Sequence, residues 1–164
     1  MNPATEGDTP LPARVAEHLQ PGESLVAAIW VSRPAGVEAL RISRSEMSPW
    51  RLRRAAPESR RGVNGLPRSH AVTLDEHIRT VNDPRVLART DRRLLLLSQG
   101  LGSWRDLLPR PAGTLSPLRL RWESPRTDLT KATEQSGELR LDFTDGSYLV
   151  LLTPSAHVQP FLDG

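Results

Sequence analysis

The residues best suited to binding chemistry are the arginines of "RLRRAAPESRR", residues 51–61. The planar guanidinium group of arginine matches two oxygens of a phosphate or carboxylate at once, so a cluster of arginines suits an anionic partner. A neighbouring tryptophan adds an apolar group that can enter a lipid interface or contact a protein. The candidate binding residues for phosphate or an acidic partner are therefore Trp50, Arg51, Arg53, Arg54, Arg60 and Arg61.

This cluster belongs to a basic segment. Residues 33–68 hold nine arginines and three glutamates, a net charge of +6, whereas the whole chain carries +3 and the remainder therefore −3. The positive charge is thus local. Three interpretations stay open: a solvated loop without a partner, contact with an acidic protein surface, and contact with the phosphates of anionic lipid or nucleic acid. Nucleic-acid binders usually interleave aromatic residues with the charge, and one tryptophan gives that interpretation little support.

The remaining chemistry-bearing residues form no recognisable catalytic or metal-binding motif. The four histidines, at positions 18, 70, 77 and 157, show no i, i+4 ligand spacing, and no serine lies in a G-x-S-x-G elbow. The chain has no cysteine, which excludes disulfides and thiolate metal sites. We therefore expect neither an enzyme nor a bound metal or cofactor.

Three apolar runs predict the first strands of the scaffold that carries the candidate binding residues. "SLVAAIWVS" at 24–32 predicts a buried strand, and the runs at 85–90 and 93–98 predict two more. We interpret Thr90-Asp91-Arg92-Arg93, where the last two runs meet, as a turn rather than an active site. Asp91 is expected to bond nearby backbone amides, and the two arginines are expected to be solvated.

The second half of the chain alternates apolar and polar residues. "LRLRWES" predicts a strand with Leu118, Leu120 and Trp122 on one face, and a weaker strand is predicted within 127–133. Asp145-Gly146 predicts a hairpin with a two-residue turn. That register places Leu139, Leu141, Phe143, Tyr148, Val150 and Leu152 on one buried face. The predicted core is Val26, Ile29, Leu94, Leu96, Leu120, Leu141, Phe143, Val150 and Leu152.

Short helices and loops account for the rest. Leu11, Val15 and Leu19 recur every four residues and predict an N-terminal helix. Residues 73–81 predict a helix capped by Thr73, and residues after 155 predict a short terminal helix. Residues 1–9 are expected to be a flexible N-terminus, and residues 43–69 an insertion loop rich in Arg, Pro, Gly and Ser.

The chain contains, in this order, "LQPGESLVAA", "VLARTDRRLLLLS", "WESPRTDLTKA" and "LRLDFTDGSYLVLL", which together hold 48 of the 164 residues. With the leading helix, these stretches resemble the bacterial pleckstrin-homology-like domains, relatives of the GRAM domain. The resemblance implies a mainly β fold: a partly open β-barrel of about seven strands with short N- and C-terminal helices, formed by residues 10–164 as one domain. Two features depart from the family, a longer basic segment after the first strand and a shorter terminal helix.

These observations favour a non-enzymatic binding or assembly module that mediates protein–protein contacts in a bacterial cytoplasm. Twenty-one of the 22 basic residues are arginine, which suggests a GC-rich bacterial source. The first residues show no secretory signal, and the longest aliphatic run, 25–31, is too short to span a membrane. The alternatives are peripheral binding to anionic lipid at the inner face of the membrane through the Arg-rich loop and, behind it, nucleic-acid binding. Self-association stays open.

Overall fold

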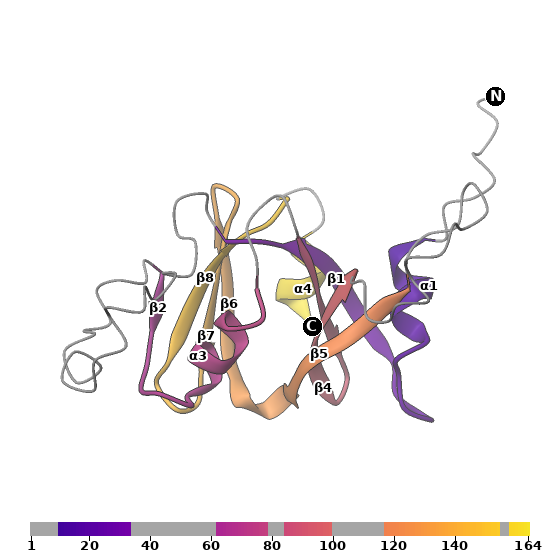
Figure 1. Ribbon diagram of the computed structural model, residues 1–164. Coiled ribbons are helices and arrows are strands. Elements are labelled where there is room, and N and C mark those ends of the chain that lie inside the picture. Colours follow the sequence, from indigo (N-terminus) through magenta and orange to yellow (C-terminus); the bar gives the residue numbers. More distant parts are fainter. Residues whose placement is uncertain (1–9, 34–61, 79–83, 100–116, 155–157) are drawn as a thin grey trace, which may run out of the picture.

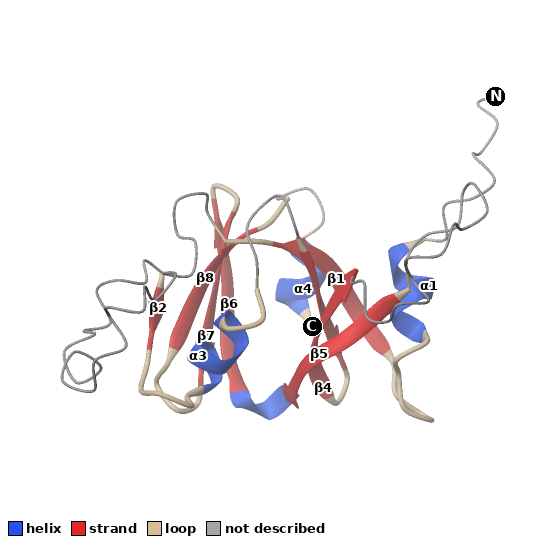
Figure 2. Ribbon diagram, in the orientation of Figure 1, coloured by secondary structure: helices blue, strands red, loops and turns tan. Residues whose placement is uncertain are grey.

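Two antiparallel β-sheets with short helices beside and between them make up the molecule (Figures 1 and 2). The mainly β character predicted from the sequence is confirmed, as are the short helices near both ends. The computed structural model describes residues 10–33, 62–78, 84–99, 117–154 and 158–164.

The strands of the first sheet are neighbours in chain order, except that β2, which belongs to the second sheet, comes between β1 and β3. The strand order of this sheet is β1-β3-β4-β5, and each neighbouring pair is antiparallel. Three of its strands agree closely with the apolar runs of the sequence. The strands are β1 (Leu25–Val31), β3 (Arg85–Thr90), β4 (Arg93–Gln99) and β5 (Leu118–Pro125).

Three of the four strands of the second sheet follow β5 along the chain, and the fourth, β2, precedes β3. A short 3-10 helix, η4 (Arg126–Asp128), connects this sheet to β5, and its strand order is β2-β8-β7-β6. Ser32, just after β1, pairs with Leu152 of β8, so the two sheets also meet at a second corner. The strands are β2 (Val63–Asn64), β6 (Leu129–Gln135), β7 (Glu138–Phe143) and β8 (Tyr148–Leu152).

The two central strands of the first sheet, β3 and β4, are buried on both sides. Leu94 and Leu96 of β4 face the main core between the sheets, whereas Leu95 and Leu97 face a second cluster on the outer side. The helix α1 (Leu11–Ala16) contributes the fully buried Val15 to that outer cluster. Figure 1 shows α1 on the outer side of this sheet. The four consecutive leucines of β4 are all apolar because the main core packs on one side of the strand and the outer cluster with α1 on the other.

Two further helices contribute to the main core. The helix α3 (His70–Asp75) supplies Ala71 and Leu74, and α4 (Gln159–Asp163) supplies the fully buried Phe161. Figure 1 shows α4 between the two sheets. The prediction for α3 was wrong in its bounds, because the helix begins before Thr73. Thr73 lies inside it and accepts a hydrogen bond from the indole N–H of Trp122.

The last hairpin has a three-residue loop instead of the predicted two-residue turn. The amide of Phe143 donates to the carbonyl of Ser147 at 2.9 Å, so residues 144–146 form the loop. Gly146 has a φ of +82°, a conformation that glycine adopts without strain. This is the common hairpin in which a type I turn is followed by a left-handed residue.

The extra loop residue changes the face of every side chain in β8. Leu149 and Leu151 are fully buried, whereas Val150 and Leu152 are only partly buried. The predicted burial of Val150, Leu152 and Tyr148 was therefore wrong, because a shift of one residue exchanges the two faces of a strand. The faces assigned to β7 were correct, since its buried residues are Leu139, Leu141 and Phe143.

Irregular strand pairing in the first sheet explains why two residues predicted to be buried, Leu120 and Val26, are exposed. Trp122 lies opposite Leu96 but Leu120 lies opposite Leu97, so Arg121 is an extra residue in β5. Such a bulge places Leu120 and Trp122 on opposite faces, and Leu120 is 40% exposed. A register shift between residues 25 and 27 accompanies the 37% exposure of Val26. The buried states of Ile29, Leu94, Leu96, Leu141 and Phe143 are confirmed.

Candidate functional site

The residues predicted to bind phosphate or an acidic partner belong to the part of the chain between β1 and β2. All six candidates, Trp50, Arg51, Arg53, Arg54, Arg60 and Arg61, lie outside the described residues, as does most of the predicted 43–69 insertion. The described end of that insertion belongs to the fold, because Val63 of β2 pairs with Leu149 of β8.

The charge of the chain is divided unevenly between described and undescribed residues. The described residues include twelve basic and twelve acidic side chains, so with neutral histidines their net charge is zero. Residues 34–61 hold seven arginines and three glutamates, a net charge of +4. The unbalanced positive charge thus belongs to the basic segment that follows β1.

Arg33, the first arginine counted in that basic segment, has a structural role. Its Nε lies 2.9 Å from a carboxylate oxygen of Asp75 in α3, and both side chains are almost fully buried. Its Nη1 donates to the carbonyl of Val150 at 2.7 Å. Arg33 therefore connects the end of β1 to α3 and β8. Arg33 lies outside the predicted 43–69 insertion, so its structural role leaves the prediction for the arginines at 51–61 unchanged.

The turn between β3 and β4 is organised by Thr90. Its buried hydroxyl accepts hydrogen bonds from the amides of Arg92 and Arg93 and donates to Glu23 at 2.6 Å. Asp91 accepts from the amide of Ser24 at 2.8 Å, so it connects the turn to the start of β1. The prediction that Asp91 would bond amides close by in the sequence was wrong, because Thr90 has that role.

Arg93 forms an ion-pair network at the same turn. Its Nη2 lies 2.6 Å from Glu23, whose side chain is fully buried, and its Nη1 also contacts Glu123. The hydrogen bond from Arg93 outweighs desolvation and lowers the pKa of Glu23 to about 2. Arg92 is exposed as predicted, but the predicted solvation of Arg93 was wrong. All these contacts stabilise a corner of the sheet.

A polar cluster that the sequence did not reveal lies where α3 meets the last hairpin. The amide of His70 donates to Asp145 at 2.8 Å, and the amide of Ala71 donates to the hydroxyl of Ser147 at 3.1 Å. The hairpin loop thus caps the first turn of α3, whose own Ser69 makes no side-chain cap. Desolvation opposes ionisation of Asp145, but hydrogen bonds from Ser147 and His70 prevail and lower its pKa.

The same cluster contains a histidine and a second carboxylate. His70 Nε2 lies 3.6 Å from Asp128, which also accepts a hydrogen bond from Ser124 at 2.7 Å. No group of three or more potential metal ligands occurs among the described residues. The only sequence signal for this cluster was the Asp145-Gly146 turn, and it indicated a hairpin rather than a partner for a helix 75 residues away.

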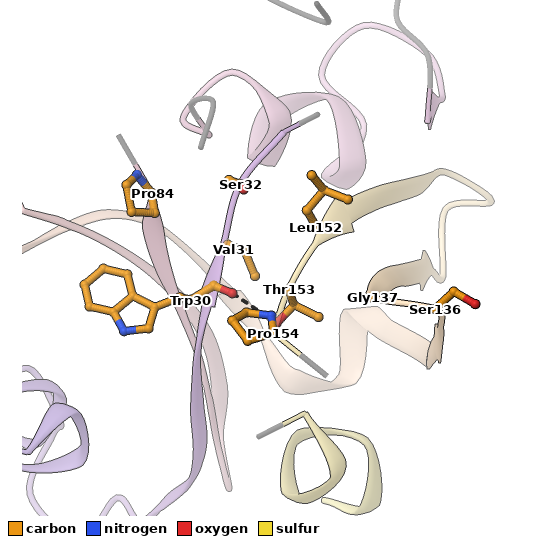
Figure 3. A pocket seen from close by; sticks show the side chains of 9 residues that line it. All are labelled: Trp30, Val31, Ser32, Pro84, Ser136, Gly137, Leu152, Thr153 and Pro154. Atoms are coloured by element: carbon orange, nitrogen blue, oxygen red, sulfur yellow. Dashed lines mark hydrogen bonds between the residues drawn. The ribbon is translucent and has the colours of Figure 1, made fainter. Parts of the chain in front are cut away.

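An apolar groove of about 400 Å³ lies at the corner where β1 and β8 meet. Figure 3 shows its lining residues, none of which has an ionisable side chain. The hydroxyl of Thr153 donates to the carbonyl of Trp30 at 3.0 Å and joins the two strands beside the groove (Figure 3). Trp30 and Leu152 are partly exposed. The apolar lining residues that are at least partly exposed are Trp30, Pro84, Leu152 and Pro154.

Comparison of the chain with protein-family models, with curated proteins and with solved structures found no match. Within the described ranges, no helix has the length and apolar character needed to cross a lipid bilayer.

Proposed function

We propose that the protein is a non-enzymatic binding module of a bacterial cytoplasm that holds a segment of a partner protein in the groove between β1 and β8. The observation that carries this proposal is the lining of the groove. Removal of its proline and aliphatic surfaces from water is favourable, and the partly exposed Trp30, which also packs against the outer cluster of the first sheet, borders the groove. Grooves lined by aromatic side chains accept extended peptide segments, often proline-rich ones.

The neighbouring charge indicates what should flank that segment. Ser32 lines the groove, and the basic segment 34–61 begins two residues later in the chain. An acidic residue beside the apolar part of the partner would be attracted by the +4 charge of this segment. We therefore propose an extended apolar or proline-containing segment with acidic flanks as the occupant.

We further propose that the two sheets form a partly open barrel of the pleckstrin-homology-like type. Two four-stranded antiparallel sheets, in which β3-β4-β5 and then β6-β7-β8 are consecutive meanders, support the resemblance. The Ser32–Leu152 bridge and the η4 connection join the sheets at two corners, as a partly open barrel requires. Backbone NMR in solution should detect the cross-strand contact between Ser32 and Leu152; its absence would contradict the barrel.

The groove is tested with a displayed library of short peptides selected on the purified protein. We expect selected sequences to be apolar with acidic flanks. Trp30→Ala should weaken their binding about tenfold or more, as expected for loss of an aromatic anchor. The matched control is Leu66→Ala, because Leu66 is 79% exposed and does not line the groove. Selected peptides that bind the Trp30→Ala variant as tightly as the original protein would overturn the proposal.

A second candidate function is contact with anionic membrane lipid. The specific observation is that the described residues have no net charge while residues 34–61 carry +4. Each arginine near an anionic surface contributes about 1 kcal/mol of attraction. Substitution of Arg51, Arg53 and Arg54 by serine should then abolish flotation with phosphatidylserine vesicles at low salt. Equal flotation of variant and original protein would exclude this function; parallel binding measurements with RNA test the nucleic-acid alternative.

A further inference from the structure

Asn64, at the exposed end of β2, is followed in the chain by Gly65. In an Asn-Gly pair the backbone nitrogen of the glycine can attack the side-chain carbonyl carbon of the asparagine and close a succinimide ring. Glycine favours this attack because it has no Cβ atom to crowd the nitrogen. Asp145-Gly146 in the last hairpin is a second pair with the atoms for the same ring. The hydrogen bonds around the two pairs differ, and this difference decides which pair is open to reaction.

Both reacting groups of Asp145-Gly146 are held by hydrogen bonds. The carboxylate of Asp145 accepts from the amides of His70 and Ser147, at 2.8 Å and 2.9 Å. These bonds stabilise the ionised carboxylate, which resists attack by a nitrogen. The amide of Gly146, which would have to attack, donates to the carbonyl of Phe143 at 3.1 Å. The fold therefore protects this pair.

Neither reacting group of Asn64-Gly65 is held in this way. Within the described part of the chain, the side chain of Asn64 forms no hydrogen bond, and the amide of Gly65 donates none. The strand β2 has two residues and lies at the edge of its sheet, where it pairs with β8. Opening so short an edge strand costs little free energy. Asn64 can therefore rotate into the conformation that the attack requires.

Packing fixes glycine as the residue that follows Asn64. A Cβ atom at Gly65 would lie 2.3 Å from Oγ of Ser69 and 2.7 Å from Cβ of Ser147. The close approach of these two serines therefore leaves room only for glycine at this position. Asn64 itself lies opposite Tyr148 and is exposed, so the fold does not require an asparagine there. The reactive nitrogen is thus imposed by the fold, whereas the side chain that it attacks can be varied.

We propose that Asn64 is a site of spontaneous deamidation in the folded protein. The nitrogen of Gly65 bonds to Cγ of Asn64, the bond from Cγ to Nδ2 breaks, and the displaced nitrogen leaves as ammonia with the proton of the attacking amide. Water then opens the succinimide at either carbonyl and gives aspartate or iso-aspartate. Because the two groups belong to neighbouring residues, no catalyst is needed to bring them together.

The two products change β2 in different ways. Both add a negative charge at neutral pH, since a carboxyl group replaces a neutral amide. Iso-aspartate also inserts a methylene group into the backbone just before Gly65, where the chain is packed against Ser69 and Ser147. We therefore expect iso-aspartate to loosen the connection from β2 to α3. The site is independent of the groove, which Asn64 does not line.

The test is incubation of the purified chain at mildly alkaline pH, where the attacking amide loses its proton more readily. Digestion after arginine then yields peptide 62–68, which contains Asn64, and peptide 80–85, which contains Asn82. Asn82 is the internal control, because the side chain of the following aspartate crowds the attacking nitrogen. Mass spectrometry should show Asn64 converted about tenfold faster than Asn82, which corresponds to about 1.4 kcal/mol in activation free energy. Conversion of Asn64 no faster than that of Asn82 would overturn the proposal.

The comparison with Asp145 tests the structural argument. Chromatography that separates aspartate from iso-aspartate should find iso-aspartate in peptide 62–68 and none in peptide 141–164. Iso-aspartate that forms at Asp145 as fast as at Asn64 would show that the hydrogen bonds do not decide the outcome. The matched variant is Asn64→Gln, whose longer side chain closes the ring far more slowly. Incubation should lower the midpoint of thermal unfolding of the original protein and leave that of Asn64→Gln unchanged; an equal fall in both would contradict the proposed effect of iso-aspartate.

Discussion

Strand β4 of the first sheet and strand β7 of the second differ in how many of their sides are buried. In β4 the four residues Leu94–Leu97 are all buried, because the main core lies on one side and α1 on the other. In β7 burial alternates: Leu139 and Leu141 are buried, whereas Glu138 and Arg140 are exposed. An apolar run alone does not decide between the two cases, because the run in β1 is continuous and its burial alternates.

The strongest test of this difference is a pair of substitutions in β4. Leu95→Ala should cost about 3–5 kcal/mol of unfolding free energy, and Leu96→Ala should cost the same, because each removes a fully buried side chain. Urea unfolding measures both. Leu120→Ala is the exposed control and should cost less than about 1 kcal/mol. A cost below about 1 kcal/mol for Leu95→Ala would show that α1 does not cover the outer face.

In the second sheet the two faces should behave differently. Leu151→Ala should cost about 2–5 kcal/mol because its side chain is fully buried, whereas Val150→Ala should cost about 1 kcal/mol. The same urea measurement decides between the three-residue loop and a two-residue turn. If Val150→Ala were the more destabilising of the pair, the hairpin would have the register with a two-residue turn.

The corner of the first sheet should depend on pH. The pKa of Glu23 is lowered from 4.5 to about 2, so its ionised form stabilises the fold. This contribution is complete above pH 4.5 and is lost as the pH falls toward 2, because the unfolded chain binds the proton more readily. Glu23→Gln should cost about 2 kcal/mol at pH 7 and flatten this dependence. An unchanged stability profile between pH 5 and 2 would contradict the network.

The smallest expected effect lies in the loop of the last hairpin. Gly146→Ala should cost about 1 kcal/mol, because its φ of +82° strains a residue with a Cβ atom. The added methyl group meets no other atom within 4 Å, so packing contributes nothing. Gly146→Asn should cost less, since asparagine tolerates this conformation. Equal costs for both variants, measured by thermal unfolding, would argue against backbone strain as the cause.

Local sequence patterns predicted a strand or helix well where one feature, such as an apolar run or a regular spacing of apolar residues, determines it. The strand predicted at 24–32 became β1, one residue shorter at each end, and the spacing of Leu11, Val15 and Leu19 indicated α1. The faces of β8 could not be predicted securely, because Asp145-Gly146 is compatible with hairpin loops of two or three residues. The bulge at Arg121 has no signal in the alternating pattern of β5.

Polar contacts between distant residues escaped prediction for a different reason. Arg33 and Asp75 are buried together, and Thr90 contacts Glu23, yet no spacing in the sequence brings these residues into register. Charge alone made Arg33 look like a member of the basic segment. The predicted binding residues in 50–61 stay a prediction, since they lie outside the described residues.

The capping of α3 by the last hairpin has a consequence for synthesis of the chain. His70 and Ala71 find their acceptors in Asp145 and Ser147, so the helix lacks these bonds until some 75 more residues have been made. At about 5–20 residues per second this interval lasts roughly 4–15 s on the ribosome. A helix of six residues is too short to persist alone in water. The nascent chain therefore presents Ala71 and Leu74 to solvent, and to any chaperone, throughout that interval.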